Sequence, residues 1–81
     1  MFDEQFRADL KWWYKSDPKI ADKILDLISD TMHDPFSGLG KPEPLKYLDS
    51  NVWSRRITLE HRLVYRVGNE RVDFLQVRYH Y

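Results

Sequence analysis

The stretch RLVYRVGNERVDFLQVRY, residues 62–79, decides the fold because it contains two alternating segments joined by a turn. Apolar and polar side chains alternate along 62–67 and again along 71–79, which predicts two strands with one buried face each. Gly68-Asn69 between them favours a tight hairpin turn. The stretch therefore predicts an antiparallel hairpin.

Two more strand candidates, 45–48 and 52–59, precede this hairpin. In the last three of these segments, one set of alternate residues is mostly apolar, and we expect this set to face the core. That face carries Trp53, Ile57, Leu59, Leu63, Tyr65, Val67, Leu75, Val77 and Tyr79. The opposite face carries Arg56, Arg62, Arg66, Gln76, Arg78 and His80. Solvated strand faces usually mix charges, so a face this rich in guanidinium indicates a phosphate partner.

Upstream of the strands, apolar residues recur at helical spacing in two segments separated by Ser16-Asp17-Pro18. Asp17 suits a helix cap and Pro18 a first helical turn, so two helices joined by a tight corner are predicted. Helices followed by strands predict an α+β domain. We expect an N-terminal αα-hairpin on one face of a mostly antiparallel, twisted sheet, with room for a short N-terminal strand and with residues 1–81 forming a single domain.

Composition excludes several classes of protein. The 81 residues contain no cysteine, which excludes disulfides and thiolate metal sites. No apolar run is long enough to span a bilayer, and an acidic N-terminus argues against a signal peptide, so the cytoplasm is expected. The overall charge is zero, but residues 1–34 hold eight acids and five bases, whereas 35–81 hold five acids and eight bases. The second half can therefore present a positive face to phosphate.

Four motifs occur in the second half: GLGKPEPLK at 38–46, WSRRI at 53–57, EHRLVY at 60–65 and RYHY at 78–81. Their order and spacing closely resemble the YoeB-type toxins of the RelE superfamily, the ribosome-dependent mRNA interferases of bacterial type II toxin–antitoxin systems. The resemblance implies a RelE-like fold and cleavage of mRNA in the ribosomal A site. It also implies neutralisation by a cognate YefM/Phd-like antitoxin and is compatible with a homodimer.

The resemblance assigns roles by motif position. Glu43 matches the family's general base, Arg62 the arginine that stabilises the scissile phosphate, and His80 the general acid. Three further residues match substrate-binding positions: Lys46, Arg56 and Tyr81. No cofactor is implied.

The chemistry of these residue types is sensible on its own. Metal-independent RNA cleavage uses the 2′-hydroxyl as nucleophile and needs a base, cations for the phosphorane and an acid for the leaving 5′-oxygen. A carboxylate near His80 would favour its imidazolium form, which suits an acid. A metal site is not expected, because the three histidines lack ligand spacing. Arg55 is expected to be solvated or a packing residue, and His61 to be structural.

Two alternatives remain open. A ParE-like inhibitor would share the fold and poison gyrase without cutting RNA, and a catalytically silent module would bind RNA or the ribosome through the arginine face alone. Neither needs the set Glu43, Arg62 and His80. One departure from the family pattern affects the fold: only Met1-Phe2 precede the first helix, so the sheet edge there should be shortened or the helix displaced.

Overall fold

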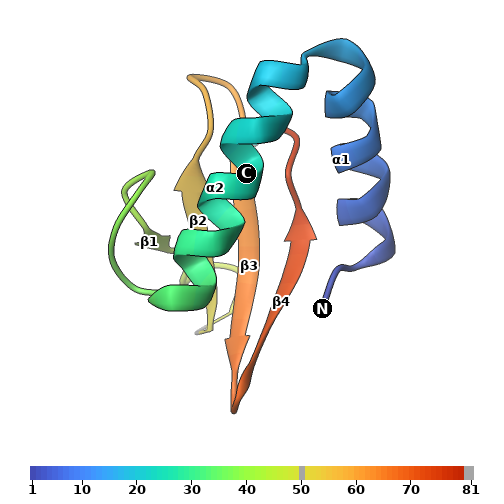
Figure 1. Ribbon diagram of the computed structural model, residues 1–81. Helices are drawn as coiled ribbons and strands as arrows, with labels where there is room; N and C mark the ends of the chain where they lie inside the picture. Colours follow the sequence, from blue (N-terminus) through green and yellow to red (C-terminus); the bar gives the residue numbers. More distant parts are fainter. Residues whose placement is uncertain (50, 80–81) are drawn as a thin grey trace.

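The computed structural model describes residues 1–49 and 51–79 (Figure 1). Two helices come first, α1 (Glu4–Ser16) and α2 (Pro18–His33). Four strands follow, namely β1 (Glu43–Pro44), β2 (Val52–Arg56), β3 (Arg62–Gly68) and β4 (Arg71–Gln76). The strands pair antiparallel in the order β1-β2-β3-β4, and the predicted α+β architecture is confirmed.

Aspartates define the ends of the two helices. The Asp3 carboxylate accepts from the Gln5 N–H and caps α1. Asp17 serves both helices, because its N–H donates to the Trp13 carbonyl at the end of α1 while its carboxylate accepts from the first turn of α2. Pro18 occupies the first position of α2, where no N–H is needed. The corner between the helices is therefore a single residue.

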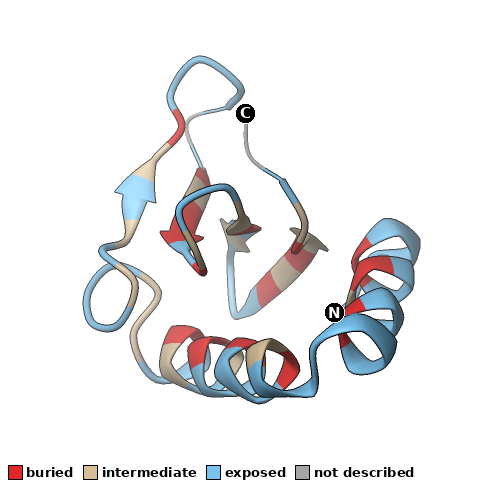
Figure 2. Cartoon of the chain, turned by 90° about the horizontal axis from the view of Figure 1, so that it is seen from above, coloured by how far each residue is buried: buried red, intermediate tan, exposed pale blue. Residues whose placement is uncertain are grey.

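Both helices cover the same face of the sheet (Figures 1 and 2). Their inward side chains meet those of β2, β3 and β4 in one buried cluster. This core consists of Phe6, Trp13, Ala21, Ile24, Leu27, Ile57, Leu63, Tyr65, Val72, Phe74 and Val77. Burial of large apolar side chains is the main stabilising contribution in a domain of this size.

The opposite face of the sheet carries Arg56, Arg62 and Arg66, as predicted, but it is not uniformly open. Val52, directly opposite Arg66, belongs to a second buried cluster on this face. That cluster consists of Leu45, Val52 and Val64, with Leu75 packed against it. We call this side the arginine face; it has charged ends and a small apolar middle.

The predicted face of Leu75 was wrong because β4 contains an irregularity. Val64 pairs with Gln76, whereas Tyr65 pairs with Phe74, so the register shifts there and Leu75 lies against the second cluster. An extra residue in one strand reverses the alternation beyond it. Phe74, not Leu75, therefore enters the core, while Val77 returns to it as predicted.

Four other predictions near strand ends were wrong. Segment 45–48 forms a turn, with the Leu48 N–H donating to the Leu45 carbonyl, and the short β1 comes before it. Leu59 is 89 % exposed because β2 ends at Arg56 and a turn follows. Tyr79 is also exposed. Arg78 does not join the arginine face, because its guanidinium lies 3.7 Å from the ring centre of Trp12 on α1.

The start of the chain adds one residue pair to the sheet instead of a strand. Phe2 forms a single parallel bridge with Phe74, supported by hydrogen bonds from the Phe74 N–H to the Met1 carbonyl and from the Asp3 N–H to the Phe74 carbonyl. Within the described residues, this edge of the sheet therefore carries one bridge in place of a fifth strand. The Phe2 ring also packs against Phe6 and Phe74.

Candidate functional site

Strand register brings Glu43 and Arg62 to the arginine face from different strands. Glu43 pairs with Ser54, and Arg56 pairs with Arg62 in the adjoining row. Directly opposed residues in antiparallel strands share a face, so all four side chains lie on one side of the sheet. The sheet therefore assembles a carboxylate and two guanidinium groups from three separate motifs.

Arg62 is the centre of this group. Its Nη1 donates to the buried Ser54 hydroxyl at 3.0 Å and to Glu43 Oε2 at 3.4 Å. The Arg62 side chain is 23 % exposed and that of Glu43 is 60 % exposed. An ion pair this exposed contributes little to stability. Both groups are consequently accessible to a ligand.

The remaining cations extend the positive surface. Arg56 is exposed beside Arg62, and Lys46 is exposed in the turn that follows β1. The sequence prediction that these groups share a region with Glu43 and Arg62 is supported for Arg56 by its direct pairing. Lys46 follows Glu43 closely in the chain but lies beyond the end of the strand.

The C-terminal segment approaches the site through the backbone of Arg62. The Arg62 N–H donates to the Tyr79 carbonyl at 2.8 Å, and the Tyr79 N–H donates to His61 Nδ1 at 2.7 Å. His80 and Tyr81 lie outside the described residues. The segment is thus fixed beside Arg62 up to the residue before His80. His61, which also contacts the Trp13 ring, has the structural contacts that the sequence predicted.

Arg55 is the residue whose importance the sequence did not reveal. It is fully buried on the helix side of β2, and its guanidinium donates to five acceptors. These are Asp30 Oδ2 (2.5 Å), the carbonyls of Asp34 (2.6 Å), Ser37 (3.0 Å) and Leu39 (3.0 Å), and the Tyr65 hydroxyl (3.2 Å). We call this set the Arg55 network. Of the two predicted roles for Arg55, packing is confirmed.

The Arg55 network holds the segment 34–39, which leads into β1 and Glu43. A main-chain hydrogen bond from Leu39, and then Arg55 itself, lowers the pKa of the Asp30 carboxyl. The N–H of Phe36 and the Ser37 hydroxyl lower the pKa of Asp34. Burial raises the pKa of the Tyr65 hydroxyl, which donates to the Pro35 carbonyl at 2.5 Å. The sequence contained a clue, because Arg55 alternates with Trp53 and Ile57, which were predicted to face the core. A charge buried there requires hydrogen-bonding partners.

Two glycines allow this segment to pass close to its neighbours. Gly38 has φ +112°, and a Cβ there would lie 2.2 Å from Asp30 Oδ2. Gly40 has φ +77°, and a Cβ there would lie 2.9 Å from the Arg56 carbonyl. The Gly40 carbonyl in turn accepts from the Arg56 N–H at 2.7 Å. A side chain at Gly38 would collide with Asp30 on α2, and one at Gly40 would push the chain away from β2.

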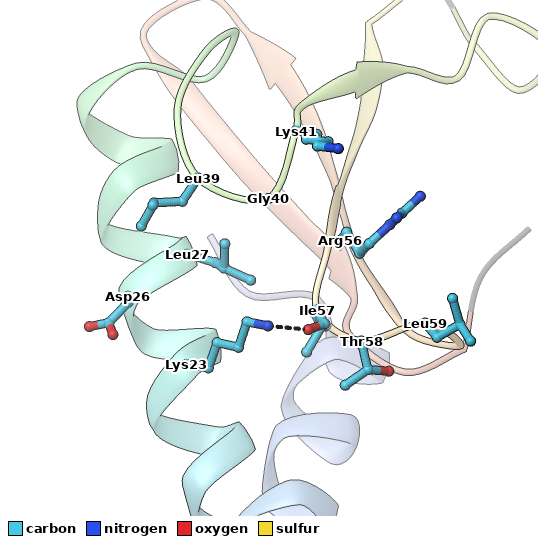
Figure 3. Close-up of a pocket in the computed structure, with 10 residues that line it drawn as sticks. All are labelled: Lys23, Asp26, Leu27, Leu39, Gly40, Lys41, Arg56, Ile57, Thr58 and Leu59. Atoms are coloured by element: carbon cyan, nitrogen blue, oxygen red, sulfur yellow. Dashed lines mark hydrogen bonds between the residues drawn. The ribbon is translucent and has the colours of Figure 1, made fainter.

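A groove of about 580 Å³ opens next to Arg56, between α2, segment 39–41 and the residues after β2 (Figure 3). Its floor is apolar, and its rim carries more cations than anions. The floor is made by the buried Leu27 and Ile57, the exposed Leu39 and Leu59 add further apolar lining, and the charged residues of the rim are Lys23, Asp26, Lys41 and Arg56. The Lys23 ammonium donates to the Ile57 carbonyl at 2.5 Å and closes one end of the groove. The positive surface therefore continues from the arginine face around the end of β2.

Two observations concern only the residues that the structure describes. Among residues 1–49 and 51–79, no group of three or more histidine, cysteine, aspartate and glutamate side chains is arranged to hold a metal ion. Neither of the described helices is both long and apolar enough to cross a membrane.

Two helices on one face of a four-stranded antiparallel sheet, with a carboxylate and arginines on the other face, define a small α+β protein with a cationic surface. Residues 2–81 match the family described as YoeB-like toxin of bacterial type II toxin-antitoxin system. The chain belongs to this family of toxins.

Individual relatives agree along the full length. Toxin RelK of Mycobacterium tuberculosis is 51 % identical over 80 residues, which cover 99 % of this chain and 94 % of that protein. The YoeB dimer from Staphylococcus aureus has a TM-score of 0.91 at 36 % identity, covering 100 % of this chain and 94 % of that one. The heterotetrameric YoeB–YefM toxin–antitoxin complex from the same species has a TM-score of 0.88 at 36 % identity, with the same coverage.

Proposed function

We propose that this toxin is a ribosome-dependent endoribonuclease that cleaves mRNA in the ribosomal A site and so inhibits translation in the bacterial cytoplasm. The reaction is attack of the 2′-hydroxyl on the adjacent phosphate without a metal cofactor. A new P–O2′ bond forms, the P–O5′ bond breaks, and the products are a 2′,3′-cyclic phosphate and a 5′-hydroxyl.

One observation carries the proposal. Glu43 and Arg62 reach the same face from different strands and lie 3.4 Å apart, both with exposed atoms. The Arg62 backbone also binds Tyr79, the residue before His80. Three motifs from distant parts of the sequence thus converge on one surface, as an acid–base reaction at a phosphate requires.

Each residue then has a role that fits its chemistry. Glu43 takes the proton from the 2′-hydroxyl or orients that hydroxyl. Arg62 and Arg56 stabilise the extra negative charge of the phosphorane, and this electrostatic contribution is usually the largest one. His80 protonates the departing 5′-oxygen. Lys46 and Tyr81 bind the substrate.

We further propose a YefM/Phd-like antitoxin as the partner that silences the site. The S. aureus relative is known as a complex with YefM, and this chain offers a basic rim and an apolar floor next to Arg56. An acidic segment with apolar side chains matches that surface. The S. aureus dimer supports a homodimer for the free toxin.

The decisive experiment is a single-turnover assay of mRNA cleavage with the purified toxin, with and without ribosomes. We expect endonucleolytic cleavage only with ribosomes. The chemical step should persist when chelator is added after ribosome assembly is secured. Loss of the step on selective metal removal, with intact ribosomes, would contradict the metal-free mechanism.

The same assay separates the alternatives. Gyrase inhibition without RNA cleavage would identify a ParE-like inhibitor. Ribosome binding without cleavage would identify a silent binding module. Either outcome would remove the acid–base roles from Glu43, Arg62 and His80.

A further inference from the structure

Tyr79 has an unusual backbone conformation at the point where the chain leaves the described structure. Its φ is +62°, in the left-handed region that residues with a Cβ rarely occupy. The residue is 57 % exposed, so burial does not explain the conformation. A residue in this region persists only when its surroundings hold it there, and such residues cluster at functional sites.

Two neighbouring residues hold Tyr79 from the start of β3. Its N–H donates to His61 Nδ1 at 2.7 Å, and its carbonyl accepts from the Arg62 N–H at 2.8 Å. The rings of His61 and Tyr79 lie 5.2 Å apart. Both polar groups of the Tyr79 backbone are therefore satisfied by the residues that lead into the candidate site.

Trp13 supports this arrangement from behind. Its indole lies edge-on to His61, with ring centres 4.9 Å apart and an interplanar angle of 88°. The indole N–H donates to the Val77 carbonyl at 2.7 Å, and Trp13 is only 5 % exposed. One buried side chain thus orients His61 and anchors the segment that His61 holds.

The hydrogen bond also defines the state of the imidazole. A nitrogen that accepts from an N–H carries no proton, so neutral His61 has its proton on Nε2. A proton on Nδ1 would place two N–H groups against each other and break the contact with Tyr79. The contact therefore requires an acceptor at Nδ1, which an aromatic ring of similar shape does not provide.

We propose that His61 is a positioning residue for RNA cleavage: it holds Tyr79 in the left-handed conformation and thereby fixes the backbone immediately before His80. This inference rests on the proposed role of His80 as the general acid. Small displacements of a reacting group cost large factors in rate, since a shift of about 1 Å can slow a reaction about 100-fold.

Two substitutions separate positioning from packing. His61→Phe keeps a ring for Trp13 and Tyr79 but removes the acceptor, whereas His61→Asn keeps an oxygen near the place of Nδ1 and removes the ring. At saturating ribosomes we expect His61→Phe to slow single-turnover cleavage by about 10-fold to 100-fold, by the same displacement argument. The ribosome concentration at half-saturation should not change, and His61→Asn should recover most of the rate. A merely packing role predicts the reverse order, with Phe harmless and Asn harmful, and would overturn the proposal.

A second measurement does not depend on cleavage. Nitrogen chemical shifts of His61 in the free toxin should show an unprotonated Nδ1, and the Tyr79 amide should exchange faster with solvent in His61→Phe than in His61→Asn. A protonated Nδ1 in the neutral ring would refute the contact itself. If the shifts are as expected but the wild-type toxin cleaves nothing, the proposed function fails, and the catalytic part of this inference fails with it.

Discussion

The two faces of the β2–β3 hairpin use arginine in opposite ways. Arg55 is fully buried on the helix side, and five acceptors surround its guanidinium. Arg62 lies on the other side, and its side-chain hydrogen bonds within the described residues come from Nη1, to Ser54 and Glu43. The Arg55 guanidinium links distant parts of the chain, whereas the Arg62 guanidinium stays partly exposed at the surface.

This contrast assigns stability to the helix side of the hairpin and the proposed activity to the arginine face. Arg55 pairs with Leu63 and Arg56 with Arg62, so residues with contrasting tasks are neighbours in the register. Arginine suits both tasks because its planar fork binds several oxygens at once, whether these belong to carbonyls or to phosphate. Mutations on the two faces should therefore affect different measurements.

The largest effect should come from Arg55→Ala. Breaking a buried ion pair by removing one partner costs about 3–5 kcal/mol, and four further acceptors lose their donor here. We expect a loss of this size in the free energy of unfolding, measured with denaturant. Arg56→Ala is the matched control on the adjacent, exposed position and should stay within about 0.5 kcal/mol. If Arg55→Ala does not fold, Arg55→Lys should show a smaller loss, and wild-type stability in either variant would contradict the role of the network.

Arg62→Ala should have the second largest effect, on rate. Removing one donor that stabilises transition-state charge typically slows the reaction about 100-fold to 1,000-fold, which is about 2.7–4 kcal/mol. The free energy of unfolding should fall by only about 1 kcal/mol, because Ser54 loses one hydrogen bond. Single-turnover cleavage and denaturant unfolding are measured on the same preparation. Arg66→Ala, on the same face, is the control, and a large loss of stability in Arg62→Ala would mark Arg62 as structural.

Strong acid should weaken the Arg55 network. Asp30 and Asp34 have pKa values lowered below 3.8 in the folded state, Asp30 mainly by the Leu39 N–H and Arg55. Their contribution to stability is therefore present above the unfolded value and is lost as the pH falls through the folded values. We expect Asp30→Asn to destabilise the toxin near neutral pH, by less than Arg55→Ala because the amide oxygen still accepts hydrogen bonds. The difference from wild type should shrink towards pH 3, and a constant difference would contradict this assignment.

The smallest effect should be that of Arg56→Ala on ribosome binding. An exposed guanidinium that contacts one phosphate of single-stranded RNA contributes about 0.7 to the slope of log affinity against log salt. We expect a loss of affinity of a few-fold at low salt and a slope reduced by about that amount. Titration at several salt concentrations measures both. An unchanged slope would mean that Arg56 contacts no phosphate.

The sequence predicted the local features of the fold well. Helical spacing and Asp17-Pro18 located both helices and their corner, and Gly68-Asn69 located the last hairpin. These features depend on residues that are close in the chain. Motif positions singled out Glu43 and Arg62 as candidates, and their meeting on one face follows from strand register.

The features that the sequence did not predict depend on contacts between distant segments. The displacement of Leu75 arises from a register shift that no single residue type predicts. β2 is shorter than predicted because the residues after Arg56 bond to His61 across a turn. The Arg55 network requires segment 34–39 to fold back over β2, which depends on the full three-dimensional path of the chain.

The single bridge between Phe2 and Phe74 has a consequence for folding and association. The bridge closes a loop of about seventy residues, and closing so long a loop costs more conformational entropy than closing a hairpin. We therefore expect the bridge to form late in folding. Together with the Met1 ammonium, which donates to the Val72 carbonyl at 2.7 Å, the same bridge pairs part of the outer edge of β4. When the first residues fray, unpaired N–H and C=O groups appear along that edge and can template pairing with another chain. We therefore expect pairing of the first three residues with β4 to disfavour edge-to-edge association.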